Sequence, residues 1–357
     1  MIHVRNATLA RRLLHRAYAA RLRKLHPLRV VFWEATRACN LACVHCGSSC
    51  GPRPEPDELS TDEVIAAFRD VAGAYRARDV LVAITGGEPL LRPDLLEVMA
   101  ALSALGFPLG MVSNGWLLDP PAARALVECG LMTISVSVDG LEATHDQVRR
   151  RRGSFARALA ALDAVAAFHP HLAAEAITCV SRANLGDLHE LGTLLERKRV
   201  RRWRIETVIP IGRAARCAEL TLDRAGLSRV LDFVEAERAR GRNVSFGCEG
   251  WLGSRELLAR DRFFLCQAGV TVGSILACGD VGACPDVNPS FTVGNVRRDR
   301  FPDLWERAFG AYRNRQWMRE REPCAGCGAW RDCAGGAMHT WSRAREKLGC
   351  TYMTLCG

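Results

Sequence analysis

The chain lacks several features that would assign it to a membrane or to the cell exterior. It has no run of 18 or more apolar residues, so no transmembrane helix is expected. Its basic N-terminus is not followed by a continuous apolar segment and a small-residue cleavage site, which argues against a secretory signal. It also has no low-complexity segment. With 357 residues, 48% of them hydrophobic, it can form one large α/β domain and a smaller one.

Cysteine and positive charge, in contrast, are abundant. The sixteen cysteines cluster at metal-ligand spacings without an export signal before them, which favours a reducing cytoplasm over a disulfide framework. The formal charge of +10 is a weak indication of binding to nucleic acid or membrane, because arginine on helix surfaces accounts for much of it. We expect no nucleic-acid partner.

The first 27 residues are predicted to be a separate basic amphipathic segment, helical over 8–26. One face carries apolar side chains, namely Leu14, Tyr18, Leu22 and Leu25. Such a helix could contact anionic lipid or an acidic partner. The preferred interpretation is packing on the base of the main domain, with the arginines in solvent.

From residue 28 to 242, strand-like and helix-like runs alternate six times. The expected strands are Leu28–Glu34, Val80–Thr85, Pro108–Ser113, Thr133–Val138, Ala173–Val180 and Trp203–Ile209. The expected helices are Thr61–Ala77, Pro93–Leu105, Pro121–Glu128, Phe155–Phe168, Leu185–Arg197 and Arg224–Arg240, and Ser60 with Glu63 forms a capping box before the first. This alternation predicts parallel βα units in a partial (β/α)6 TIM-like barrel, whose site lies at the carboxyl ends of the strands.

The composition of the chain changes at residue 243. Glycine and cysteine become dense, and one short helix over about 302–318 separates two groups of cysteines. Residues 243–357 are therefore predicted to be a small cysteine-rich C-terminal domain.

Three cysteines within eight residues follow the first expected strand. Cys39, Cys43 and Cys46 have the spacing C-x3-C-x2-C. Three thiolates on one loop can hold three irons of a [4Fe–4S] cluster and leave the fourth iron open to a ligand. The alternative is a structural zinc site completed by His45 or Cys50.

This motif resembles the signature of the radical S-adenosylmethionine (radical SAM) superfamily, in which an aromatic or imidazole residue, here His45, often precedes the last cysteine. The resemblance implies that the three cysteines ligate a [4Fe–4S] cluster whose open iron binds SAM. One electron from the cluster would cleave SAM into methionine and a 5′-deoxyadenosyl radical.

Polar and glycine motifs follow the later strands, where barrel enzymes place their site residues. The resemblance implies that Gly86-Gly87-Glu88-Pro89 binds the SAM amino group and that Ser113 and Asn114 lie near the ribose. Ser137 would also meet the ribose, Asp139 belongs to the same family pattern, and Arg149 would meet the SAM carboxylate. Ile209–Arg213 resembles a family segment near the adenine.

The C-terminal cysteines resemble the SPASM extension of radical SAM enzymes. Cys324-x2-Cys327-x5-Cys333 alone could be a zinc ribbon, but Cys266, Gly279 and Cys284 match the first part of the extension. The family pattern expects a further cysteine where this chain has Ala337. By resemblance, one or two auxiliary [4Fe–4S] clusters are expected, with two sets of ligands: Cys324, Cys327, Cys333 and Cys350, and Cys266, Cys278, Cys284 and Cys356.

The resemblance implies hydrogen-atom abstraction from a ribosomally made peptide or a protein, with the auxiliary clusters handling electrons and oxidation or crosslinking as the outcome. A dehydrogenase or epimerase acting on a sugar or cofactor precursor is the alternative, and an electron carrier or scaffold is a third class. An external electron donor such as flavodoxin or ferredoxin is expected. Only 38 residues precede Cys39, too few for a peptide-binding winged-helix domain, so recognition would depend on a separate partner protein or on the barrel itself.

Overall fold

A computed structural model describes residues 2–198, 200–342 and 344–356. Its centre is one ten-stranded sheet with the strand order β10-β9-β8-β1-β2-β3-β4-β5-β6-β7. The eight strands from β8 to β7 are parallel to their neighbours, and β9 and β10 continue the sheet antiparallel. The first six strands are β1 (Val30–Glu34), β2 (Leu81–Thr85), β3 (Leu109–Ser113), β4 (Leu131–Ser137), β5 (Ala173–Val180) and β6 (Arg202–Thr207).

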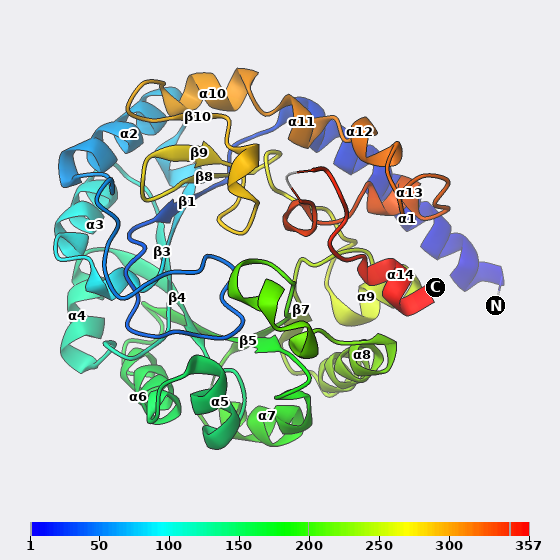
Figure 1. Cartoon of the computed structure of the whole chain (residues 1–357), viewed down its shortest axis with the longest axis horizontal. Helices are drawn as coiled ribbons and strands as arrows, with labels where there is room; N and C mark the ends of the chain where they lie inside the picture. The colour runs from blue at the N-terminus through cyan, green and yellow to red at the C-terminus, as the bar shows by residue number, and fades with distance from the viewer. Residues whose placement is uncertain (1, 199, 343, 357) are drawn as a thin grey trace.

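Six helices follow these six strands and form an outer ring around the sheet (Figure 1). They are α2 (Thr61–Ala74), α3 (Leu95–Ala104), α4 (Pro120–Glu128), α6 (Ser154–Ala166), α7 (Leu188–Arg197) and α8 (Arg224–Ala239). The predicted capping box is present, since Ser60 and Glu63 each accept a hydrogen bond from the other's backbone amide. The six βα units and the partial-barrel architecture are thus confirmed.

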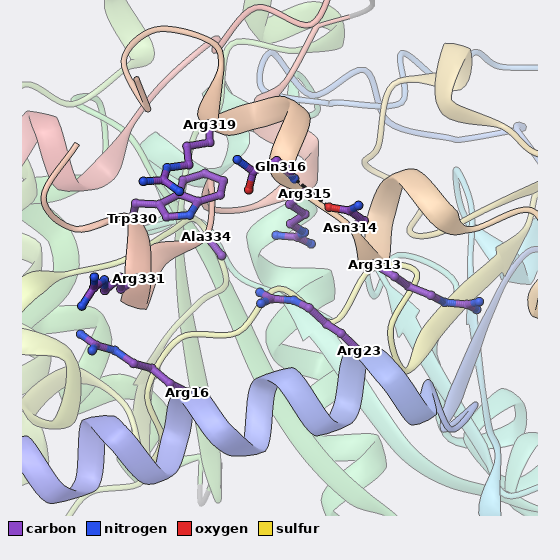
Figure 2. Close-up of a pocket in the computed structure, with 10 residues that line it drawn as sticks. All are labelled: Arg16, Arg23, Arg313, Asn314, Arg315, Gln316, Arg319, Trp330, Arg331 and Ala334. Atoms are coloured by element: carbon purple, nitrogen blue, oxygen red, sulfur yellow. Dashed lines mark hydrogen bonds between the residues drawn. The ribbon is translucent and has the colours of Figure 1, made fainter. Parts of the chain in front are cut away.

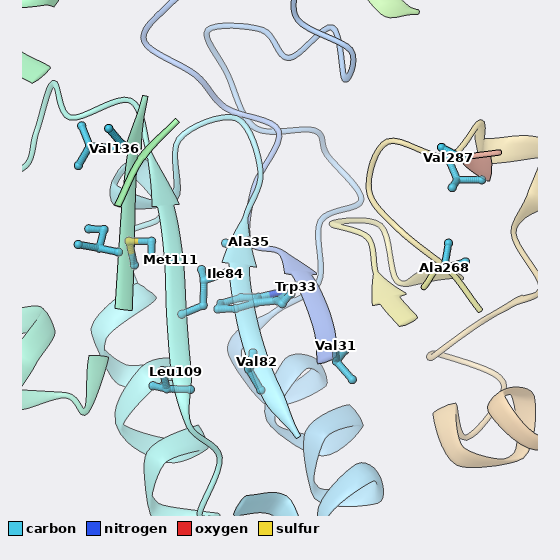
Figure 3. Close-up of a cluster of buried hydrophobic side chains, with 14 of the residues drawn as sticks. Val31, Trp33, Ala35, Val82, Ile84, Leu109, Met111, Val136, Ala268 and Val287 are labelled. Carbon is cyan, nitrogen blue, oxygen red and sulfur yellow. The ribbon is translucent and has the colours of Figure 1, made fainter. Parts of the chain in front are cut away.

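The core forms where buried side chains of the parallel strands pack against those of the surrounding helices. Val82, Ile84, Leu109 and Trp33 are fully buried there, and Figure 3 shows them on β1, β2 and β3. Burying one such side chain contributes about 1.5–3 kcal/mol, so the sheet is a rigid support for the loops at its carboxyl edge.

Four strands were not predicted. β7 (Val244–Phe246) pairs with β6, and β8 (Val272–Ile275) pairs with β1, while β9 (Asp280–Gly282) and β10 (Gly294–Asn295) follow β8. Each has two to four residues, too few to show the alternation of apolar and polar side chains by which a strand is recognised in a sequence. The sheet therefore continues past residue 243, and the proposed C-terminal unit 243–357 shares strands with the barrel.

The expected helix over 302–318 is wrong as a single element. The structure has three pieces, α10 (Phe301–Arg307), α11 (Gly310–Arg313) and α12 (Gln316–Arg319). Side chains replace the helical hydrogen bonds at the breaks, since Arg315 Nε donates to the Tyr312 carbonyl at 3.0 Å. Further short helices are α5 (Glu142–Arg149), α9 (Glu256–Ala259), α13 (Trp330–Cys333) and α14 (Thr351–Cys356).

The N-terminal helix is present as α1 (Ile2–Leu25), but its packing differs from the preferred interpretation. Arg12 and Arg16 do not extend freely into solvent; both form ion pairs with Asp332 of α13, whose side chain is only 3% exposed. The apolar face remains mostly exposed, including Leu14 and Tyr18. Among the described residues, no helix combines the length and hydrophobicity that crossing a membrane requires.

We predict that Asp332→Asn loosens α1, because two guanidinium groups lose their shared carboxylate, at a cost of about 1.5–3 kcal/mol. Hydrogen–deuterium exchange of residues 9–25 should accelerate. Asp261→Asn is the matched control, since Asp261 pairs with Arg238 but is 73% exposed and contributes little. Unchanged exchange in Asp332→Asn would contradict the docking described.

Candidate active site

The loop that carries Cys39, Cys43 and Cys46 connects β1 to α2 and contains no helix or strand. Its backbone is held by the rest of the chain. The Cys39 amide donates to the Gly51 carbonyl at 2.6 Å, and Arg213 donates to the carbonyls of Cys43 and Cys50, both at 2.8 Å. Arg213, expected near the adenine of SAM, thus contacts the cysteine loop itself.

Gly86 and Gly87 allow the end of β2 to approach this loop closely. A Cβ atom on Gly86 would lie 2.4 Å from the Thr36 carbonyl oxygen, and one on Gly87 would lie 2.2 Å from that of Ala38. The amides of Gly87 and Glu88 donate to these same two carbonyls, each at 2.8 Å. The glycines therefore position the loop, a role that the sequence did not indicate.

Glu88 is fully buried and connects the ends of β2 and β3. Its carboxylate accepts hydrogen bonds from Ser113 Oγ at 3.0 Å and from the Asn114 amide at 2.8 Å, and burial raises its pKa. The Asn114 side chain donates to Asn40 Oδ1 at 2.8 Å, on the cysteine loop. Pro89 begins the short turn that follows.

A buried ion pair lies at the end of β4. Asp139 Oδ2 is 2.6 Å from Arg149 Nη2 and 3.3 Å from His45 Nε2, and Arg149 Nη1 is 3.6 Å from Cys43 Sγ. Burial raises the pKa of Asp139, but the charge of Arg149 outweighs it and holds the pKa below its ordinary value. Burial lowers the pKa of His45, so its ring is neutral. Arg149 remains charged in this setting.

Two further residues belong to the segment at and after the end of β4. His145 Nδ1 accepts a hydrogen bond from the Asp139 amide at 2.9 Å, and burial lowers the pKa of His145 to about 4, so its ring is neutral. Ser137 is the last residue of β4. Of the predicted residues, Glu88, Asn114 and Arg149 contact the cysteine loop, and they come from three strand ends.

The surroundings of the three cysteines fit an iron–sulfur cluster. Burial raises the pKa of Cys39 to about 11 and also raises the pKa of Cys43, so thiolates there need nearby positive charge, hydrogen-bond donors or bound iron. Arg149, Asn114 and Arg213 supply the charge and the donors. Cys50 donates a hydrogen bond to Cys46 and lowers the pKa of that thiol. In the described part of the chain no three His, Cys, Asp or Glu side chains lie close enough for one metal ion. A cluster is compatible with this, because each thiolate binds a different iron.

A pair of glutamates was missed by sequence reasoning. Glu206 lies near the end of β6, Glu249 follows β7, and a Cβ on Gly247 would contact both side chains. Glu249 is 6% exposed; its Oε1 accepts from the Thr207 amide at 2.7 Å, whereas Oε2 is buried without a partner among the described residues. Burial and the charge of Glu206, only partly offset by Arg260, raise the pKa of Glu249 to about 7. The two glutamates are brought together by the pairing of β6 with β7, which no local sequence pattern predicts.

Four C-terminal cysteines gather around one small cavity. It is lined by Cys324, Cys327, Cys333 and Cys350, together with Lys347. The Lys347 ammonium donates to the Gly335 carbonyl at 2.6 Å and offsets negative charge from the thiolates. This is the first set of auxiliary ligands expected from the sequence, and the structure brings all four together.

The second expected set is more scattered. Burial raises the pKa of the Cys284 and Cys248 thiols, and Cys266 adds to the rise in both, so these three cysteines lie near one another. Cys278 lies instead beside Asp280, Asp57 and Glu34. Cys356 is exposed on α14. Ala337, where the family pattern has cysteine, is fully buried, and the neighbouring Met338 amide donates to Cys266.

The comparisons with known proteins agree with this geometry. Residues 33–187 match the family model of the Radical SAM superfamily, and residues 266–328 match SPASM, an iron–sulfur cluster-binding domain. The mycofactocin maturase MftC of Mycobacterium ulcerans is 34% identical over 86% of this chain and 82% of its own length. An AdoMet-dependent heme synthase of Nitratidesulfovibrio vulgaris is 27% identical, covering 92% and 94%.

Two solved structures are similar in fold. Streptococcus suis SuiB bound to precursor peptide SuiA has a TM-score of 0.72 at 16% identity, covering 94% of this chain and 78% of that chain. Native anSMEcpe with bound AdoMet has a TM-score of 0.70 at 18% identity, covering 92% and 94%.

The position of Cys350 in the cavity and of Cys356 outside it leads to a prediction. After anaerobic reconstitution, Cys350→Ala should lose about four irons per chain or hold them less stably, because one cluster lacks a ligand. The matched variant Cys356→Ala should retain the wild-type iron content. Equal losses in both variants would mean that Cys356 is a ligand after all.

Proposed function

The chain belongs to the radical SAM superfamily and carries a C-terminal SPASM-type iron–sulfur domain, and we propose that it abstracts a hydrogen atom from a ribosomally made peptide or a protein. As an enzyme of this family it binds a [4Fe–4S] cluster, SAM and auxiliary iron–sulfur clusters. We assign Cys39, Cys43 and Cys46 to the SAM cluster. The observation that carries this assignment is the convergence of Glu88, Asn114 and the Asp139–Arg149 pair on that loop.

Similarity to a maturase and the acidic character of Glu206 and Glu249 support the choice of a peptide. The relatives include both maturases and heme synthases, at 34% and 27% identity for the two described above. Arg204, whose Nε lies 3.4 Å from Glu206 Oε1, offsets part of the negative charge of the two glutamates. The carboxylates of a tetrapyrrole would meet what remains of this charge, whereas a peptide backbone is neutral. A small-molecule substrate, such as a sugar or cofactor precursor, remains the second candidate because of the heme synthase relatives.

When bound, the clusters supply the electron that cleaves SAM to a 5′-deoxyadenosyl radical and an acceptor for an electron from the substrate. The protein's own residues are proposed to bind and orient SAM. Glu88, Ser113, Asn114 and Ser137 are proposed to contact SAM. Arg149 keeps positive charge beside Cys43 and is proposed to face the SAM carboxylate.

Glu249 is the proposed proton acceptor. A substrate carbon that loses a hydrogen atom and then one electron must also release a proton to form a double bond or a new bond. The free Oε2 of Glu249, with a pKa of about 7, is suited to receive it. We further propose a reducing cytoplasm as the location and a flavodoxin or ferredoxin as the electron donor.

The substrate class can be tested with reconstituted enzyme, SAM and dithionite. One arm receives a short peptide encoded beside the gene, and the other receives iron coproporphyrin III. We expect a mass change only in the peptide, with deuterium moving from a labelled peptide into 5′-deoxyadenosine. Conversion of the tetrapyrrole instead, with the peptide unchanged, would replace the proposal by its alternative.

The proton step predicts a pH dependence. The carboxylate fraction of Glu249 rises from roughly one tenth at pH 6 to nine tenths at pH 8, so product formed per 5′-deoxyadenosine should rise over this range. In Glu249→Gln this ratio should fall and lose its pH dependence, while 5′-deoxyadenosine is still released. Glu219→Gln, on the short turn Ala218–Leu220, is the control. An unchanged pH profile in Glu249→Gln would exclude the role.

A further inference from the structure

A cavity of about 460 Å³ lies between α1 and the C-terminal segments α11, α12 and α13. Figure 2 shows its lining, in which positive charge is concentrated. None of the lining residues is acidic, and six are arginines: Arg16, Arg23, Arg313, Arg315, Arg319 and Arg331. The volume falls within the range of small-molecule sites.

Only part of this charge is compensated. Asp332 is the carboxylate that pairs with the arginines of α1, and it is shared between Arg12 and Arg16. Arg315 is buried and donates to three backbone carbonyls, those of Tyr312, Gly336 and Cys266. Its side chain also donates to the Cys266 thiol and lowers the pKa of that thiol, so Cys266 offsets part of the Arg315 charge and no carboxylate among the described residues does.

Of the six, Arg23 alone has a buried side-chain nitrogen, its Nε, that lacks a hydrogen-bond partner among the described residues. Burial and the charge of Arg315 lower the pKa of Arg23 to about 10, although Cys266 opposes the shift, and Figure 2 shows the two guanidinium groups pointing toward each other. A buried charge next to a like charge is costly unless an opposite charge joins them.

We propose that this arginine cavity, defined by the six arginines above, binds a small oligoanion with two or more phosphate or carboxylate groups. Arg23 and Arg315 bind one anionic group between them, since guanidinium forks bind both chemistries in bidentate geometry. Arg16 and Arg331 approach each other on the same side of the cavity (Figure 2) and bind a second group. Trp330 offers an aromatic face to the remainder of the ligand.

The binding test uses the reconstituted full-length protein and two probes, pyrophosphate for phosphate groups and citrate for carboxylate groups. Calorimetry should show saturable binding of at least one, and the stronger probe identifies the chemistry. Arg23→Met should weaken this binding at least about ten-fold. Arg21→Met, an exposed residue on the same helix, should bind as the wild type does.

Thermal unfolding gives a second signature that misfolding would not produce. Without oligoanions, Arg23→Met should raise the Tm, because it removes a partly buried charge that lies beside the like charge of Arg315. With pyrophosphate or citrate, the wild type should gain stability and the variant should not. Potassium chloride at equal ionic strength must not reproduce the gain. Equal responses to chloride, or equal affinities in wild type and Arg23→Met, would overturn the proposal. So would the absence of a specific effect from either probe, the result expected of a surface for an acidic protein.

Discussion

The buried ion pair between Asp139 and Arg149 is the interaction on which the site depends. It joins the end of β4 to α5, and through Arg149 Nη1 it reaches Cys43 on the cysteine loop. Removing one partner of such a pair leaves the other charged and buried, which typically costs about 3–5 kcal/mol. An arginine is required because its guanidinium stays protonated and can contact a carboxylate and a sulfur with different nitrogens. A loop without secondary structure thereby acquires a defined position beside the sheet.

The same loop shows how a small set of contacts replaces secondary structure. Its carbonyls accept hydrogen bonds from Arg213 and from the amides of Gly87 and Glu88, so these buried polar groups are paired. Gly86 and Gly87 are needed because a side chain on either would overlap the loop backbone. Positive charge thus gathers around Cys43 and Cys46, while negative charge gathers at Glu206 and Glu249, near the ends of β6 and β7.

Much of the architecture was predictable because it depends on local patterns. The six βα units follow from short apolar runs alternating with amphipathic ones, and the capping box at Ser60 and Glu63 is a local signal. β7 and β8 could not be predicted, since three or four residues show no period and their pairing depends on distant strands. Glu249 and Cys248 were missed for the same reason: what distinguishes them is the neighbours that β7 brings to them. The family resemblance implied the set of Cys324, Cys327, Cys333 and Cys350, but not which cysteines lie near Cys266.

The central claim is that Cys39, Cys43 and Cys46 hold the cluster that cleaves SAM, apart from the clusters of the C-terminal domain. The most direct measurement is iron and 5′-deoxyadenosine per chain after anaerobic reconstitution, for the wild type and for Cys39→Ala/Cys43→Ala/Cys46→Ala. The account predicts that the variant loses about four irons and all release of 5′-deoxyadenosine, while the C-terminal irons remain. Nucleoside release by the variant, or a wild type that holds zinc and does not cleave SAM, would contradict it.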